Sequence, residues 1–195
     1  MSTHHCSGTS QCSHGGNCEK EETNLIADLQ EMLLEQQQQG DKIGEVQSLH
    51  AISSCYFAQG EYDKAQEYLQ QSLTQVQLLG DREAEAEMLN NLAQLCNARE
   101  EYDNAIAYLE KAMAIQNDIN DVEGLSSSIF NLGHLHLQKK DMAQAAVTWT
   151  SLYKFAREMD LNDVLTELES LAEQLGLPGG NNAWQLLLEQ MDKGE

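Results

Sequence analysis

Proline and basic residues are scarce in this sequence. Its 195 residues include one proline, Pro178, and 11 lysines and arginines against 32 aspartates and glutamates. Because proline breaks helices, its scarcity favours long uninterrupted helices. The formal net charge of −21 argues against nucleic-acid binding, which needs a basic surface, and against an anionic membrane as partner. We expect a protein or peptide partner that is basic or neutral, although an acidic surface that serves solubility explains the charge equally well.

Long hydrophobic runs and catalytic motifs are also missing. No apolar stretch approaches the roughly 18 residues of a membrane span, and the polar N-terminus lacks the apolar region of a secretory signal. We therefore expect a cytoplasmic protein. The sequence has no glycine-rich phosphate loop, no nucleophile elbow and no HExxH motif. Its carboxylates follow no fixed partner pattern, so we expect no enzymatic activity.

The chain contains instead a period of 40 residues. The segments GEYDKAQEYLQQSL, EEYDNAIAYLEKAM and KDMAQAAVTWTSLY begin at residues 60, 100 and 140 and align on Ala65, Ala105 and Ala145. A small-residue column (Ser53, Ala93, Gly133) and a bulky column (Leu69, Leu109, Trp149) keep the same register. A fixed period of this size predicts a solenoid of stacked helical units.

These columns resemble the tetratricopeptide repeat, over roughly residues 23–176. The 40-residue form, with Asn-Leu-Ala or Asn-Leu-Gly in the first helix, is similar to the subgroup of cell-polarity adaptors and kinesin light chains. The resemblance implies an all-α fold, a right-handed α-solenoid of antiparallel helix pairs. It also implies a binding scaffold, a fold that serves many unrelated partners.

The period divides the chain into a tail and a repeat domain. Residues 1–21 are rich in Gly, Ser, Cys and His, a composition that predicts disorder. Residues 22–195 form the predicted repeat domain: a half-repeat (23–40), three full repeats (41–80, 81–120, 121–160) and capping helices (161–195). Gly40-Asp41 and Gly80-Asp81 predict helix ends, because Gly adopts the left-handed C-terminal position and Asp caps the next helix.

A concave groove is predicted on the first helices of the pairs. Its residues are those that the packing columns leave over: His50, Ser54, Phe57, Asn90, Asn91, Gln94, Asn97, Phe130, Asn131, His134 and Leu137. The resemblance implies that Asn91 and Asn131 hydrogen-bond the backbone of a bound peptide; alternatively, they face solvent. Phe57, Phe130 and Leu137 either anchor a partner's side chains or pack between repeats. The absence of cations here argues against the clamp with which other family members bind chaperone C-termini.

The tail supplies a second hypothesis. It holds six potential metal ligands in fifteen residues: His4, His5, Cys6, Cys12, His14 and Cys18. Thiolate and imidazole ligands suit zinc, copper or an iron–sulfur cluster, although the spacing is not that of a zinc finger. The alternatives are a disordered tail with incidental cysteines and a disulfide-forming tail. Cys55 and Cys96 are expected to pack in the core, and the fold is expected to need no cofactor.

Overall fold

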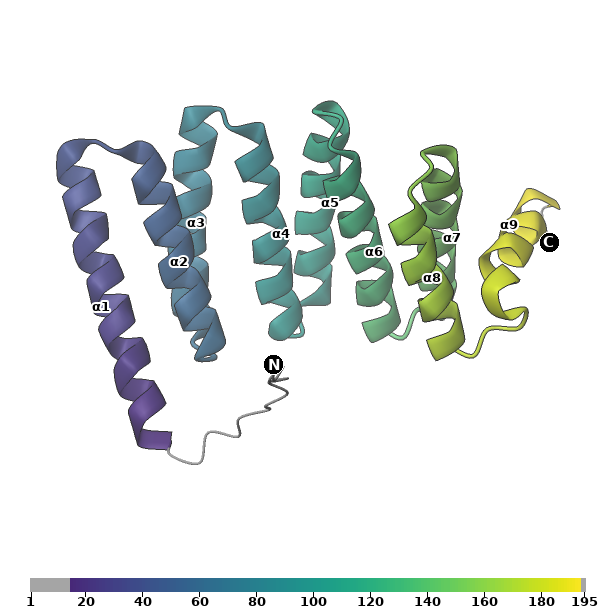
Figure 1. Cartoon of the computed structure of the whole chain (residues 1–195), viewed down its shortest axis with the longest axis horizontal. Coiled ribbons are helices and arrows are strands. Elements are labelled where there is room, and N and C mark those ends of the chain that lie inside the picture. Colours follow the sequence, from purple (N-terminus) through teal and green to yellow (C-terminus); the bar gives the residue numbers. More distant parts are fainter. Residues whose placement is uncertain (1–14, 194–195) are drawn as a thin grey trace, which may run out of the picture.

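The computed structural model describes the backbone of residues 15–193 and the side chains of residues 25–193 other than 181 and 192. Within that range the elements are α1 (Gly15–Gln39), α2 (Lys42–Ala58), α3 (Tyr62–Leu79), α4 (Arg82–Ala98), α5 (Tyr102–Asp118), α6 (Val122–Gln138), α7 (Met142–Glu158), α8 (Asn162–Gln174), a short 3₁₀ turn (Gly180–Asn182) and α9 (Ala183–Lys193). Successive helices run antiparallel and stack side by side in an elongated array (Figure 1). The predicted all-α solenoid is confirmed.

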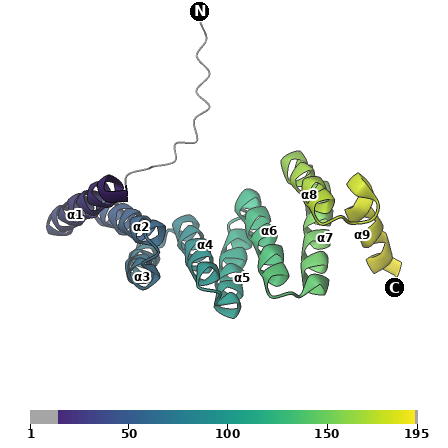
Figure 2. The same ribbon diagram turned by 90° about the horizontal axis from the view of Figure 1, so that it is seen from below.

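The helices form two rows. Figure 2 shows α2, α4, α6 and α8, the first helices of the pairs, along one side of the array, and α3, α5 and α7, the second helices, along the other. We call the side formed by α2, α4, α6 and α8 the first-helix face. The first helices begin at residues 42, 82, 122 and 162, which keeps the 40-residue period of the sequence.

A left-handed residue ends a helix every 20 residues. Residues 40, 60, 80, 100, 120, 140 and 160 all have φ between 55° and 76°. The N–H of the next residue then donates to the carbonyl five positions back, as from Asp41 to Gln36 (2.9 Å) and from Asp121 to Gln116 (2.8 Å). This is the Schellman geometry of a helix C-terminus. The predicted caps are present as well, because Asp41 and Asp81 accept the N–H groups of Gly44 and Ala84.

The alanine column lies in the core. Ala65, Ala105 and Ala145 have no exposed surface. Their small side chains let the two helices of a pair approach closely. In the first pair, the hydroxyl of Ser53 donates to the carbonyl of Ala65 at 2.8 Å. Cys96 is buried with Ala93 and Ala105, and Cys55 packs against the cluster at the N-terminal end, so both cysteines lie where packing was predicted.

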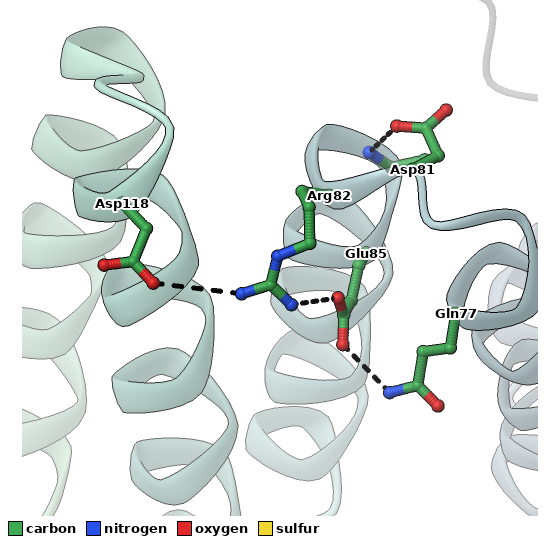
Figure 3. Close-up of polar contacts among 6 residues, drawn as sticks. Gln77, Asp81, Arg82, Glu85 and Asp118 are labelled. Carbon is green, nitrogen blue, oxygen red and sulfur yellow. Dashed lines mark hydrogen bonds and ion pairs between the residues drawn. The ribbon is translucent and has the colours of Figure 1, made fainter.

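Polar contacts at the start of α4 join it to both of its neighbours, α3 of the preceding pair and α5 of its own pair (Figure 3). Arg82 pairs with Glu85 in its own helix (2.5 Å) and approaches Asp118 of α5 at 3.9 Å. Glu85 also accepts a hydrogen bond from Gln77 of α3 (2.9 Å). The carboxylate of Glu85 thus links α3 to α4, and Arg82 links α4 to α5.

The N-terminal boundary differs from the prediction. Helix α1 begins at Gly15, eight residues before Thr23 and inside the segment 1–21 that was predicted to be disordered. Extending a packed helix is easier than nucleating one, because each added residue contributes one hydrogen bond. Glu and Lys in this extension are good helix formers. Further along, Ile26 and Leu33 of α1 pack on Leu49 and Ile52 of α2.

Candidate functional site

Three adjoining hollows run along the first-helix face. The α2–α4 hollow (about 100 Å³) is lined by His50, Ser53, Ser54, Phe57, Leu69, Asn91, Gln94 and Leu95. The α4–α6 hollow (about 270 Å³) is lined by Asn90, Ala93, Gln94, Asn97, Leu109, Asn131, His134, Leu135 and Gln138. The α6–α8 hollow (about 890 Å³) is lined by Glu123, Ser126, Ser127, Phe130, Asn131, His134, Asp160, Leu161, Asn162, Asp163, Val164 and Glu167.

Shared residues make the hollows one continuous row. Gln94 lines the first and second, and Asn131 and His134 line the second and third. Ten of the eleven residues predicted for the groove lie in these walls. The exception is Leu137, which lines none of the three and packs instead against the buried cluster of Trp149 and Trp184. Of the two roles considered for Leu137, anchoring a partner or packing between repeats, its surroundings match packing.

The amide side chains of the row fall into two groups. The amide nitrogen Nδ2 of Asn91 lies within hydrogen-bonding distance of the ring nitrogen Nε2 of His50, at 3.0 Å. The amide oxygen of Asn90 accepts a hydrogen bond from the hydroxyl of Ser128 at 3.0 Å. Both therefore connect neighbouring first helices. Gln94 and Asn131 are exposed, and neither makes a side-chain hydrogen bond within the described part of the chain. Their donors and acceptors are available to a ligand.

Asn97 carries the one buried amide oxygen of the row that lacks a partner. Its Oδ1 is fully shielded from solvent and accepts no hydrogen bond from any described residue. A buried acceptor without a donor costs free energy, so such atoms are rare in folded proteins. Asn97 lines the α4–α6 hollow with its other atoms, while its shielded Oδ1 is out of reach of a ligand in this conformation.

The two phenylalanines of the row are placed differently. Phe57 is 39% exposed at the edge of the α2–α4 hollow, with its ring centroid 5.6 Å from that of Tyr62. Phe130 is half-buried: its ring meets His134 edge-on at 4.8 Å, and its carbonyl accepts the indole N–H of Trp149 at 3.1 Å. Phe130 thus serves the core and also forms part of the wall of the α6–α8 hollow.

Charge is unevenly distributed along the row. Among the residues that the structure describes, no lysine or arginine lines any of the three hollows. The carboxylates Glu123, Asp160, Asp163 and Glu167 all belong to the α6–α8 hollow. Burial lowers the pKa of His134 below its ordinary value, and the nearby Glu167 carboxylate acts in the opposite direction. The row is therefore neutral in the α2–α4 and α4–α6 hollows and anionic in the α6–α8 hollow.

The α8 side of the largest hollow was missed by the sequence argument, which treated residues 161–195 as capping helices only. The available signal was the 40-residue step, because α8 begins at residue 162, in register with α6 at residue 122. Helix α8 thus takes the place of a fourth first helix. It contributes Asn162, Asp163, Val164 and Glu167 to the hollow.

The predicted metal ligands of the tail all fall at positions whose side chains the structure does not describe. His4, His5, Cys6, Cys12 and His14 lie outside the described residues, and Cys18 falls in α1 at a position whose side chain is not described. Among the side chains of residues 25–193 that are described, no group of three or more His, Cys, Asp or Glu is arranged to hold a metal ion.

No helix in the described part of the chain has the length and apolar character needed to cross a bilayer.

Comparison with known protein families identifies one family whose model matches this chain. A family model for the tetratricopeptide repeat matches residues 45–118 and 84–148, which together span just over half of the chain. No curated protein matches the chain.

Solved structures with similar helical arrays are distant in sequence. The kinesin light chain-like repeat protein of Podosopora anserina superposes with a TM-score of 0.65 at 15% identity, covering 90% of this chain and 89% of that one. BtubC from P. vanneervenii gives 0.66 at 15%, covering 89% and 74%. A Rap protein complexed with competence and sporulation factor gives 0.67 at 20%, covering 89% of this chain but 48% of that one. At these identities the likeness concerns the fold alone.

Proposed function

The chain belongs to the tetratricopeptide repeat family, and from this premise we propose that it is a protein–protein interaction scaffold whose partner binds along the row of hollows on the first-helix face. The observation that carries the proposal is the continuity of that row. Three hollows share Gln94, Asn131 and His134 as common walls, so an extended segment that enters one hollow meets the next.

The chemistry of the walls favours a peptide as the bound segment. Gln94 and Asn131 each offer a free amide with both a donor and an acceptor, which matches a peptide group without adding charge. Phe57, 39% exposed beside the α2–α4 hollow, is available to anchor an apolar side chain, and aromatic anchors in pockets supply much of the affinity of such interfaces.

The proposal is tested by a pull-down from native lysate, read by mass spectrometry, with the intact chain and the variant Gln94→Ala/Asn131→Ala. Both residues are exposed and make no side-chain hydrogen bond among the described residues, so the variant should keep the thermal stability of the parent chain. Loss of two polar contacts at an interface should weaken partner binding by about tenfold or more. This pair is a cleaner test than Asn91, whose amide already contacts His50.

The matched control is Gln70→Ala/Gln71→Ala. Both glutamines are exposed amides on α3, in the other row of helices, and neither lines the row of hollows. A partner lost from the Gln94/Asn131 variant but kept by the control would support the proposed face. Equal capture by all three proteins would rule this face out as the binding site.

As a second candidate function, we propose that the N-terminal tail binds a metal ion while the repeats dock a recipient protein. The supporting observation is the density of ligands in the sequence, with cysteines at residues 6, 12 and 18. The test is the metal content of the full chain and of a form lacking residues 1–18, after anaerobic reconstitution with zinc, copper(I) or iron and sulfide. Equal metal content in the two forms would reject this function.

A further inference from the structure

The α6–α8 hollow differs from the other two hollows in charge. Its wall includes four carboxylates, those of Glu123, Asp160, Asp163 and Glu167, and all four residues are exposed. None of them is among the ion pairs of the described residues. The α2–α4 and α4–α6 hollows have no carboxylate among their described lining residues. Negative charge is thus concentrated, and left without a counter-charge, at one end of the row.

Resting on the proposed scaffold function, we propose that the partner is a peptide segment whose lysine or arginine side chains enter the α6–α8 hollow, while its uncharged part lies toward α2. Charge complementarity selects this occupant, because four unpaired carboxylates attract a cation and repel an acidic segment. The α2–α4 and α4–α6 hollows are lined by uncharged amide side chains, so they favour the uncharged part of the peptide. The direction of the bound segment along the array follows from this asymmetry.

The apolar part of the hollow suits the same side chains. Phe130, Leu161 and Val164 line it together with the carboxylates. Lysine and arginine cover apolar surface with their aliphatic stems and keep the charged group in contact with water or an anion. The face of an aromatic ring such as that of Phe130 also attracts a cation. A volume of about 890 Å³ lies within the range of about 300–1,000 Å³ that is usual for ligand sites.

A basic side chain fits the hollow better than an inorganic cation does. A divalent metal needs several oxygen ligands converging at short distance. The described residues contain no group of three or more acidic, histidine or cysteine side chains arranged in that way. The carboxylates of Glu123 on α6 and of Asp163 and Glu167 on α8 instead line a wide opening, as an extended cationic segment requires.

The test begins with a display library of random dodecapeptides selected on the intact chain at physiological salt. The selected peptides are synthesised, and their affinities are measured by fluorescence anisotropy. The test variant is Glu123→Gln/Asp163→Asn/Glu167→Gln. The control variant is Glu31→Gln/Glu35→Gln/Glu110→Gln. It removes the same number of exposed carboxylates from α1 and α5, none of which pairs with a described cation or lines the row. Thermal melts followed by circular dichroism verify that both variants fold.

The expected result is a set of peptides with lysine or arginine near one end and uncharged residues near the other. Their affinity should fall about tenfold in the test variant, as expected for the loss of three exposed ion pairs, and should change little in the control variant. An equal loss in both variants would show a general attraction to the acidic surface and would overturn the proposal.

Other outcomes separate this proposal from the scaffold function. Neutral or acidic peptides that bind equally to parent and test variant, but weakly to Gln94→Ala/Asn131→Ala, would overturn the cationic assignment and leave the scaffold function intact. Peptides indifferent to both sets of substitutions, or the selection of no peptide at all, would overturn both.

Discussion

His134 illustrates how one residue of the row responds to its surroundings. It lies where the α4–α6 and α6–α8 hollows meet, with its ring edge-on to Phe130 (4.8 Å) and to Trp149 (5.1 Å). These aromatic neighbours withhold water from the ring, so burial is the larger influence and lowers the pKa of His134. The carboxylate of Glu167, the charged group that faces it from α8, raises that pKa in part.

We predict that NMR titration of His134 gives a pKa below the ordinary 6.5, and that Glu167→Gln lowers this pKa further because the opposing charge is gone. The unfolded chain then binds a proton at higher pH than the folded chain does. The contribution of His134 to stability is therefore present above pH 6.5 and is lost as the pH falls below it. Glu173→Gln, an exposed substitution on the same helix away from the hollow, should leave the titration unchanged. A pKa at or above 6.5 would contradict the assignment.

The different surroundings of the two asparagines could not be predicted from the sequence. The 40-residue register placed Asn91 and Asn131 on first helices, where Asn91 lines the α2–α4 hollow and Asn131 lines the α4–α6 and α6–α8 hollows. It could not distinguish their roles, because the partner that occupies Asn91 is His50, 41 positions earlier and on another helix. The available amide of Gln94 and the buried oxygen of Asn97 are likewise consequences of packing between neighbouring repeats, which a one-dimensional pattern does not contain.

At the scale of elements, the third repeat departs from the second at the contact between α6 and α7. In the second repeat, Ala93 and Leu109 occupy the small-residue and bulky columns. In the third repeat, Gly133 and Trp149 occupy the same two positions. A Cβ on Gly133 would overlap the Nε1, Cε2 and Cδ1 atoms of the Trp149 indole. The absence of a side chain at Gly133 therefore makes room for the large side chain at Trp149, which is 1% exposed.

We predict that Gly133→Ala destabilises the protein by about 1–3 kcal/mol through overpacking, and that Trp149→Leu costs about 2–4 kcal/mol through the cavity it leaves. The double variant restores the Ala–Leu combination of the second repeat, so it should be less destabilised than the sum of the two changes, with a coupling of about 1 kcal/mol or more. Urea denaturation of the four proteins measures this coupling. Additive effects would show that the glycine is not required by the indole.

The matched control for this cycle is Ala93→Gly. Ala93 belongs to a different buried cluster from Trp149, so its effect should add to that of Trp149→Leu without coupling.

Element boundaries follow closely from the sequence where turn chemistry is explicit. Gly40, Gly80 and the aspartates after them end and begin helices as predicted. Other ends depend on Glu100, Lys140 and Asp160, which adopt the left-handed conformation at φ of 55–64°, a conformation that is uncommon for residues other than glycine. The periodic position of each turn, and not its residue type, indicated these ends. No such periodic signal marked the start of α1 at Gly15, where a helix is extended by its own backbone hydrogen bonds.

At the scale of the whole molecule, negative charge greatly exceeds what ion pairing neutralises. The ion pairs of the described residues use five cations: Lys42, Lys64, Arg82, Arg99 and Lys139. The chain carries 32 carboxylate side chains in all. Because the whole chain has 11 lysines and arginines, they are too few to neutralise most of these carboxylates, and the repulsion between carboxylates opposes the folded state. The same excess provides the field that would attract a basic partner to the first-helix face.

We therefore predict that stability rises with ionic strength. Increasing sodium chloride from about 0.01 M to about 0.1 M shortens the screening length from about 30 Å to about 10 Å. This weakens the repulsion between carboxylates on neighbouring repeats, so the thermal midpoint should rise by a few degrees, equivalent to about 1 kcal/mol. The variant Glu31→Gln/Glu35→Gln/Glu110→Gln changes the formal charge from −21 to −18 (−21 + 3 = −18) and should respond less to salt. A midpoint that falls with salt, or equal responses in both proteins, would show that repulsion does not limit the stability of the array.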